Sequence, residues 1–237
     1  MTATLLPATL RTLANLRDVG GLRTDDGRVV RSGVLLRSDA PQIGDAGFPA
    51  PRPSTVIDLR SAEEIDVAVH PLAAVADVHH VALGESLHPE RVAATPAAER
   101  DLAWAYRLIV LEATAELARI VRIVASASGP VLVHCAAGKD RTGIVVAVLL
   151  RAAGVRRDDV MADYLRTNDN LERLWARLEA AGAHLPSNSD ALSGVDARVL
   201  AAALDEFERH EGGIRGHLLA NGTSPADLDT LVSRLVR

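Results

Sequence analysis

Residues 131–143 read Val-Leu-Val-His-Cys-Ala-Ala-Gly-Lys-Asp-Arg-Thr-Gly, and they combine a strand, a loop and the start of a helix. The apolar run at 131–133 is typical of a buried strand, and it leads into Cys135 and a loop of small residues. Arg141 follows six positions after the cysteine and opens an apolar helix. In such a unit the backbone N–H groups of residues 136–141 can point inward, and the helix N-terminus adds partial positive charge. We therefore predict an anion-binding loop with Cys135 at its floor.

The residue types in this loop indicate nucleophilic chemistry on a phosphate group. Positive charge from Arg141 and from the helix N-terminus favours the thiolate form of Cys135, which is the nucleophilic form. The planar guanidinium of Arg141 can hold two phosphate oxygens at once, which an ammonium cannot do. We predict Cys135 and Arg141 as catalytic residues. The residues predicted to bind the substrate are Ala136, Ala137, Gly138, Lys139 and Thr142.

A structural role for the cysteine is the main alternative, because most free cysteines are buried core residues. Packing, however, does not require Gly138, Arg141 and Thr142 at their offsets from Cys135. Lys139 is the only lysine among 26 lysine and arginine residues, and it lies four positions from the only cysteine. Either this position is a coincidence, or the loop needs a compact ammonium.

The run from His134 to Gly143 resembles the signature of the Cys-x5-Arg protein phosphatases, and more closely that of the bacterial atypical tyrosine phosphatases. The lysine two positions before the arginine is also similar to the loop of eukaryotic 3-phosphoinositide phosphatases. The resemblance implies a phosphomonoester hydrolase that acts through a phosphocysteine on phosphotyrosine proteins, phosphoinositides or both. It implies no cofactor and no metal, because the loop itself supplies the positive charge.

Two further segments extend the resemblance over most of the chain. Asn15-Leu16-Arg17-Asp18-Val19-Gly20-Gly21 is similar to a segment that the family carries near its N-terminus, where the implied role is to brace the signature loop. The segment from Asp163 to Asn168 is similar to one that follows the signature helix in the family.

Two other functions stay open at the level of sequence. A rhodanese-like sulfur transferase also uses a strand, a cysteine loop and a helix, but the pattern of Gly138, Thr142 and Gly143 argues against it. A module that binds phosphorylated ligands without turnover would have no use for a reactive thiol, and this chain keeps both Cys135 and Arg141.

The general acid is the least determined member of the predicted site. Tyrosine phosphatases usually supply it from an aspartate on an upstream loop, which would fall within residues 84–101, a predicted surface loop or partial lid. None of the carboxylates there has the sequence context of such a loop, so surface charges are the simpler interpretation. We predict Asp140, inside the loop, as the first candidate and Asp58, at a strand end, as the second. Asp140 could instead orient its basic neighbours, and Asp58 could be a plain hydrogen-bond acceptor. The carboxylates of the upstream loop are Glu85, Glu90, Glu99 and Asp101.

Hydrophobic periodicity predicts an α/β, three-layer domain with a helical C-terminal half. The resemblance implies that this domain has a phosphatase-like fold with a central, mostly parallel sheet. His79 and His80 are adjacent on a predicted strand and face opposite sides, which favours a solvated pair over a metal site. Segment 40–54 is rich in proline and glycine and is predicted to be a loop. Residues 28–37 are predicted to form a hairpin or an edge strand around Gly33, and further strands are predicted at 55–60, 78–83 and 131–133. A capping box at Ser61 and Glu64 predicts the start of a short helix, and further helices are predicted at 102–127, 144–150, 157–167, 169–181, 196–211, 213–220 and from Ser224 onward.

Composition narrows the classes of protein that this chain can represent. We expect one domain over residues 1–237, because this length can bury a full core. The net charge of −5 predicts no general affinity for nucleic acid. The chain has no apolar run long enough to span a membrane, and its single cysteine suits a reducing compartment. The first ten residues lack a basic segment followed by a long apolar run, so we expect no secretory signal. We expect a cytoplasmic monomer, with export by a route without a signal peptide left open.

Overall fold

The computed structural model describes residues 6–65, 69–84, 96, 101–182 and 194–237. A five-stranded sheet in the order β1-β2-β5-β3-β4 lies at its centre. β5 occupies the middle and pairs in parallel with β2 and β3, β4 is parallel to β3, and β1 runs antiparallel to β2 at one edge. The strands are β1 (Arg17–Asp18), β2 (Leu35–Ser38), β3 (Thr55–Asp58), β4 (Asp77–His80) and β5 (Val131–His134).

The register brings the ends of three strands to one level. His134, the last residue of β5, lies opposite Ser38 of β2 on one side and Asp58 of β3 on the other. All residues of these three strands are buried, as is typical of parallel strands that are covered on both faces. Because open α/β sheets bind ligands at the carboxyl ends of their strands, the loop after His134 begins at the centre of the ligand-binding edge.

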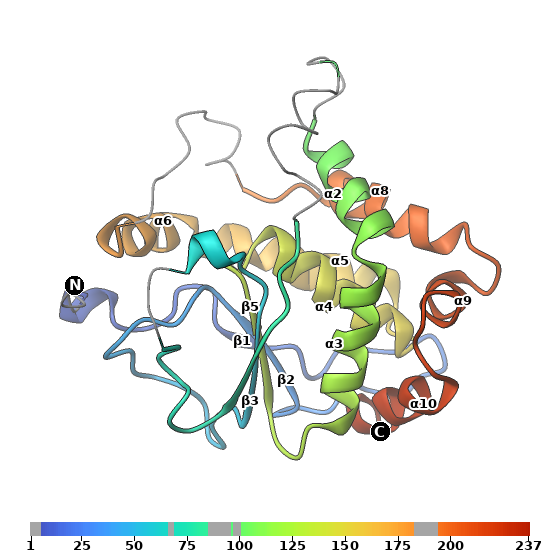
Figure 1. The fold of residues 1–237 in the computed structure, drawn as a ribbon, viewed down its shortest axis with the longest axis horizontal. Coiled ribbons are helices and arrows are strands. Elements are labelled where there is room, and N and C mark those ends of the chain that lie inside the picture. Colours follow the sequence, from blue (N-terminus) through green and yellow to red (C-terminus); the bar gives the residue numbers. More distant parts are fainter. Residues whose placement is uncertain (1–5, 66–68, 85–95, 97–100, 183–193) are drawn as a thin grey trace.

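Helices pack against the sheet and make up the C-terminal half (Figure 1). α4 is buried along almost its whole length because it lies between the sheet and α5, α8 and α9, which confirms the predicted central helix. Gly154 follows it with a φ of +83°, as a glycine beyond a helix end does. The helices are α2 (Leu102–Glu112), α3 (Thr114–Ser126), α4 (Asp140–Ala152), α5 (Arg157–Leu165), α6 (Leu171–Ala180), α8 (Ala197–Glu208), α9 (Gly213–Ala220) and α10 (Pro225–Leu235), with short 3₁₀ helices η1 (Ala8–Leu10), η2 (Ala62–Glu64) and η5 (Arg166–Asn170).

The two faces of the sheet are covered differently. In Figure 1, α3 lies to the right of the strands, whereas α6 lies to the left, at the end of the sheet where β5 leads into α4. On the face away from α3 and α4, Val56 and Leu132 pack against Leu72 and Phe48, which come from loops. The loop predicted at 40–54 therefore supplies part of the cover on this face. The predicted α/β fold with a mostly parallel sheet and a helical C-terminal half is confirmed.

Three predictions about single elements are wrong. The helix predicted over 102–127 is interrupted at Ala113, whose ψ is +34°, because α2 packs against α8 whereas α3 packs against α10. The strand predicted within 28–37 is β2, which lies inside the sheet rather than at its edge. No strand is predicted at Arg17–Asp18, but these residues form β1 because their backbone pairs with β2.

Most of the upstream segment with the other candidate acids lies outside the described residues. Glu85, Glu90 and Glu99 belong to that part, so the predicted lid is not described. Asp101 caps α2 by accepting the backbone N–H of Trp104 at 2.6 Å, which is a structural role. None of the helices within the described ranges is both long and apolar enough to cross a membrane.

Candidate active site

Residues 135–139 form a tight loop between β5 and α4. Cys135 follows directly from the central strand and is only 3% exposed. Gly138 has a φ of +65°, and a Cβ there would lie 2.1 Å from the carbonyl oxygen of Ser38. Glycine is therefore required where the loop passes the end of β2. α4 begins at Asp140, so the helix N-terminus adjoins the loop, as an anion site requires.

Two side chains from outside the loop hold one of its carbonyl groups. Asn15 Nδ2 donates to the Gly138 oxygen at 2.9 Å, and Arg37 Nη2 donates to the same oxygen at 3.0 Å. The backbone N–H of Asn15 is itself anchored on the Asp39 carboxylate at 2.8 Å. Because these side chains bind the carbonyl oxygen of Gly138, the backbone N–H groups of the loop can point inward and bind an anion. The bracing role predicted for the segment that begins at Asn15 is confirmed by these contacts.

A buried ion cluster connects this brace to the helical half of the chain. The Asp163 carboxylate on α5 accepts from Arg17 Nε at 2.8 Å and from Arg37 Nη1 at 2.9 Å. All three side chains are buried, and a buried charge is stable only when it is paired in this way. The neighbouring Tyr164 packs against Gly143, where a Cβ would lie 2.7 Å from the tyrosine ring. This close packing explains the last glycine of the signature.

Arg141 is held by a carboxylate that the sequence does not assign to the site. Glu64 of η2 accepts from Nη1 and Nη2 of Arg141, each at 2.5 Å, and also from the backbone N–H of Ser61 at 2.9 Å. The last contact belongs to the predicted capping box, which is therefore confirmed. Although burial opposes the charged guanidinium, the Glu64 carboxylate raises the pKa of Arg141 above its ordinary value.

The bond to Glu64 leaves part of the Arg141 guanidinium for a ligand. Nη1 also contacts the carbonyl oxygens of Leu59 at 3.3 Å and Leu83 at 3.5 Å, so both of its hydrogens have acceptors. Within the described part of the chain, the Nε–H and the second hydrogen of Nη2 have no acceptor. These two donors form the planar fork that can bind two phosphate oxygens.

Asp140 lies at the start of α4 with its side chain 35% exposed. The hydroxyl of Tyr106 on α2 donates to its carboxylate at 2.6 Å, and the same hydroxyl contacts that of Tyr164 at 2.8 Å. Burial and the nearby Asp140 carboxylate raise the pKa of Tyr106 well above its ordinary value. Tyr106 is therefore a neutral hydroxyl that orients the Asp140 carboxyl group.

Lys139 is almost enclosed by protein. It is 3% exposed, its Nζ lies 3.8 Å from the Asp140 carboxylate, and it lies 5.6 Å from the ring centroid of Trp175 on α6. Ala137 packs beside the same helix, next to Leu174. The ammonium therefore adds positive charge next to the loop without being presented to solvent.

Asp58 and Thr142 are both completely buried. Arg60 binds the Asp58 carboxylate through Nη2 at 2.7 Å and through Nε at 3.0 Å. Burial disfavours the charged form of Asp58, but the Arg60 guanidinium holds its pKa below the ordinary value. The Thr142 hydroxyl has no hydrogen-bond partner among the described residues.

Comparison with known proteins leads to one assignment. The model of the tyrosine phosphatase family matches residues 8–237. The chain belongs to this family. It is 33% identical to the triple specificity protein phosphatase PtpB of Mycobacterium tuberculosis, over 92% of this chain and 94% of that protein. It is 31% identical to a Cupriavidus necator protein provisionally named a tyrosine-protein phosphatase, over 87% of this chain and 81% of the relative.

Three residues of this tyrosine phosphatase's site are not identified by the sequence. Glu64 carries a sequence signal only as a helix cap, and Asp163 carries one only through the segment that resembles the family. Arg37 has no local signal, because its contact with Gly138 joins residues 101 positions apart. All three hold the residues of the loop in place, and none is expected to react.

Proposed function

We propose that this phosphatase hydrolyses phosphotyrosine in proteins and phosphoinositides through a phosphocysteine intermediate. One observation carries the proposal. A buried cysteine lies at the floor of a braced loop, and Glu64 leaves two donors of Arg141 for a phosphate. The relative named a triple specificity phosphatase supports a substrate range wider than phosphotyrosine alone.

In the first step the Cys135 thiolate attacks phosphorus. The P–S bond forms as the P–O bond to the leaving group breaks, and Asp140 gives its proton to the leaving oxygen. Arg141 and the N–H groups of the loop, including those of Ala136, Ala137 and Gly138, stabilise the equatorial oxygens as their charge develops. No further group is needed to balance this step.

In the second step water attacks the phosphocysteine. The Asp140 carboxylate takes a proton from that water, the P–S bond breaks, and inorganic phosphate is released. Cys135 leaves as a thiolate, and the buried Thr142 hydroxyl is available to donate a hydrogen bond to it. The enzyme thereby returns to its starting state.

Asp140 is the better candidate for the general acid. It is partly exposed, and a tyrosine hydroxyl can orient a carboxyl group in both protonation states because it both donates and accepts. Asp58 is bound to Arg60 on both oxygens, so we assign it the structural role at the strand end.

We expect Asp140→Asn to slow poor leaving groups far more than activated ones. Loss of general acid catalysis is expected to lower kcat roughly a hundredfold or more on phenyl phosphate, but less than about tenfold on para-nitrophenyl phosphate, whose leaving group needs no proton. Steady-state kinetics on the two esters give the comparison. Asp58→Asn is the matched variant, and it is expected to lower the melting temperature without this selectivity. A selective loss in Asp58→Asn together with equal losses in Asp140→Asn would reverse the assignment.

The proposed function is tested by phosphate release from a phosphotyrosine peptide, a phosphoserine peptide and a phosphoinositide, measured side by side. We expect release from the first and the third. Tight binding of these ligands without release would indicate a binding module instead. Transfer of sulfur from thiosulfate to cyanide without phosphate release would indicate a sulfur transferase.

The same panel tests the role of Lys139. Because its ammonium is enclosed between Asp140 and Trp175, we expect Lys139→Ala to weaken catalysis through the charge of the loop. The expected loss in kcat/KM is about tenfold and similar on the peptide and the lipid. A loss confined to polyphosphorylated lipids would show instead that Lys139 binds a second phosphate of the substrate.

We also propose that the enzyme acts as a monomer in a reducing compartment such as the cytoplasm. Its mechanism needs a reduced thiol, and the single cysteine has no partner with which to form a protective disulfide.

A further inference from the structure

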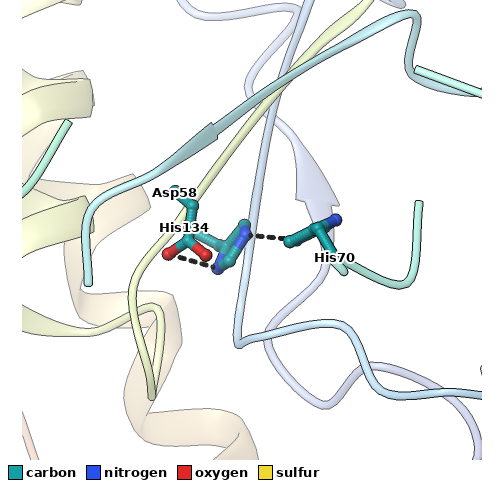
Figure 2. Close-up of side chains that lie close together, drawn as sticks. All are labelled: Asp58, His70 and His134. Carbon is teal, nitrogen blue, oxygen red and sulfur yellow. Dashed lines mark hydrogen bonds and ion pairs between the residues drawn. The ribbon is translucent and has the colours of Figure 1, made fainter. Parts of the chain in front are cut away.

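A buried pair of histidines next to the nucleophile is not used in the mechanism above (Figure 2). His70 Nε2 lies 3.0 Å from Nε2 of His134, the residue that immediately precedes Cys135. His134 is completely buried and His70 is 7% exposed. Figure 2 shows the His134 ring between Asp58 and His70, so its two ring nitrogens face different partners.

The partners of these nitrogens determine where the protons lie. The backbone N–H of Leu72 donates to His70 Nδ1 at 3.1 Å, so the proton of a neutral His70 is on Nε2. His134 Nδ1 lies 3.0 Å from the carbonyl oxygen of Cys135, which can only accept, so the proton of His134 is on Nδ1. The Asp58 carboxylate, 3.8 Å from that nitrogen, favours the same tautomer. Two hydrogen bonds therefore follow one another in the same direction: His70 donates to His134, and His134 donates to the backbone carbonyl of Cys135.

Both rings are neutral at physiological pH. Burial is the largest cause that lowers the pKa of His70 and of His134 to about 4. The other ionisable groups that act on His134 are Asp58, Arg60 and His80. In a neutral histidine ring, one nitrogen donates a hydrogen bond and the other accepts one. The two hydrogen bonds from His70 to His134 and from His134 to Cys135 require this arrangement in both rings.

A metal site is the competing explanation for this cluster. Asp58, His70 and His134 offer ligand atoms within 4.8 Å of one another, and this set of side chains suits zinc. Both oxygens of Asp58 are bound by Arg60, however, and His134 turns opposite nitrogens toward Asp58 and His70. One ion could not bind all three without displacing these contacts, whereas hydrogen bonding accounts for each of them.

We propose that His70 is a positioning residue for the nucleophile. By donating to His134, it holds that ring with Nδ1–H on the carbonyl oxygen of Cys135. This bond orients the peptide between Cys135 and Ala136, whose N–H belongs to the anion-binding loop. The inference rests on the proposed function only in taking Cys135 as the nucleophile.

The test uses the reactivity of the thiol, which requires no turnover. Because Cys135 is the only cysteine, the rate of alkylation by iodoacetamide as a function of pH reports its thiolate alone. We expect His70→Leu to move the midpoint of this profile upward by about half a pH unit or more, because a misaligned loop stabilises the thiolate less. The expected loss in kcat/KM is about threefold to tenfold.

His70→Gln is the rescue variant, because its amide can place an N–H near the position of the histidine Nε2. We expect its alkylation profile to match that of the parent enzyme. His80→Gln is the matched control, since His80 is half-exposed and lies 3.7 Å from Asp58 without contacting His134, and it should also leave the profile unchanged. If His70→Leu does not fold, His70→Asn, whose amide is too short to reach His134, takes its place.

Several outcomes would overturn the proposal. An unchanged profile in His70→Leu would do so, and so would equal shifts in the Leu and Gln variants, which would indicate a packing role only. A shift in His80→Gln would assign the effect to the charge around Asp58. Inhibition of the parent enzyme by Zn²⁺ that disappears in His70→Leu would assign a metal site. A parent enzyme that alkylates as expected but releases no phosphate would contradict the proposed function and leave the positioning role intact.

Discussion

Cys135→Ser is expected to fold like the parent enzyme and to lose at least roughly a thousandfold in kcat, which corresponds to about 4 kcal/mol. Oxygen in place of sulfur changes the packing of this buried site little. A serine hydroxyl, however, is not ionised near neutral pH and is a poor nucleophile without a base. No other thiol can replace it, because Cys135 is the only cysteine of the chain. Phosphate release from para-nitrophenyl phosphate measures the loss.

The control for this variant is its affinity for inorganic phosphate. Because Arg141, Glu64 and the N–H groups of the loop are unchanged, calorimetric titration should give a dissociation constant close to that of the parent enzyme. Thermal unfolding should also be similar. Substantial hydrolysis by a pure preparation of Cys135→Ser would rule out the phosphocysteine mechanism.

Arg141→Lys is expected to lower kcat/KM by roughly a hundredfold or more, about 3 kcal/mol, although it keeps the positive charge. The ammonium has no planar fork, so it cannot bind Glu64 and two phosphate oxygens at the same time. Steady-state kinetics on an aryl phosphate measure the effect. Activity within tenfold of the parent would mean that charge alone is sufficient at this position.

Glu64→Gln is the matched variant, because it changes how Arg141 is held and leaves the guanidinium itself in place. A neutral amide has one carbonyl oxygen where the carboxylate binds through two, so we expect an intermediate loss of about tenfold in kcat/KM. No loss in Glu64→Gln would show that the carbonyl oxygens of Leu59 and Leu83 are sufficient to hold Arg141.

The central unit of this site was predictable because it is local in sequence. The strand at 131–133, the turn at Gly138 and the buried helix after Arg141 each follow from residues within a few positions of one another. Hydrophobic period, glycine and the helix start are local signals. The same reasoning predicted the capping box at Glu64 but gave no indication that its carboxylate binds Arg141, which is 77 positions away.

Elements whose limits depend on their neighbours were predicted less well. Apolar spacing over 102–127 is continuous, yet the helix breaks at Ala113 because its two halves pack against different helices. Arg17–Asp18 has no strand signal, and it forms an edge strand only because β2 lies beside it. Both outcomes were set by tertiary packing, which overrides local preference in short segments.

By itself, the sequence determined the chemistry of this protein: a single cysteine, an arginine six positions later, and a loop whose backbone can bind a phosphate. Tertiary structure alone decided how those groups are held. It paired Glu64 with Arg141, Arg60 with Asp58 and His70 with His134, and it left the carboxyl group of Asp140 partly exposed. The physical reason is that a residue's type limits the bonds it can make, whereas its partner and burial depend on distant segments that only the folded chain brings together.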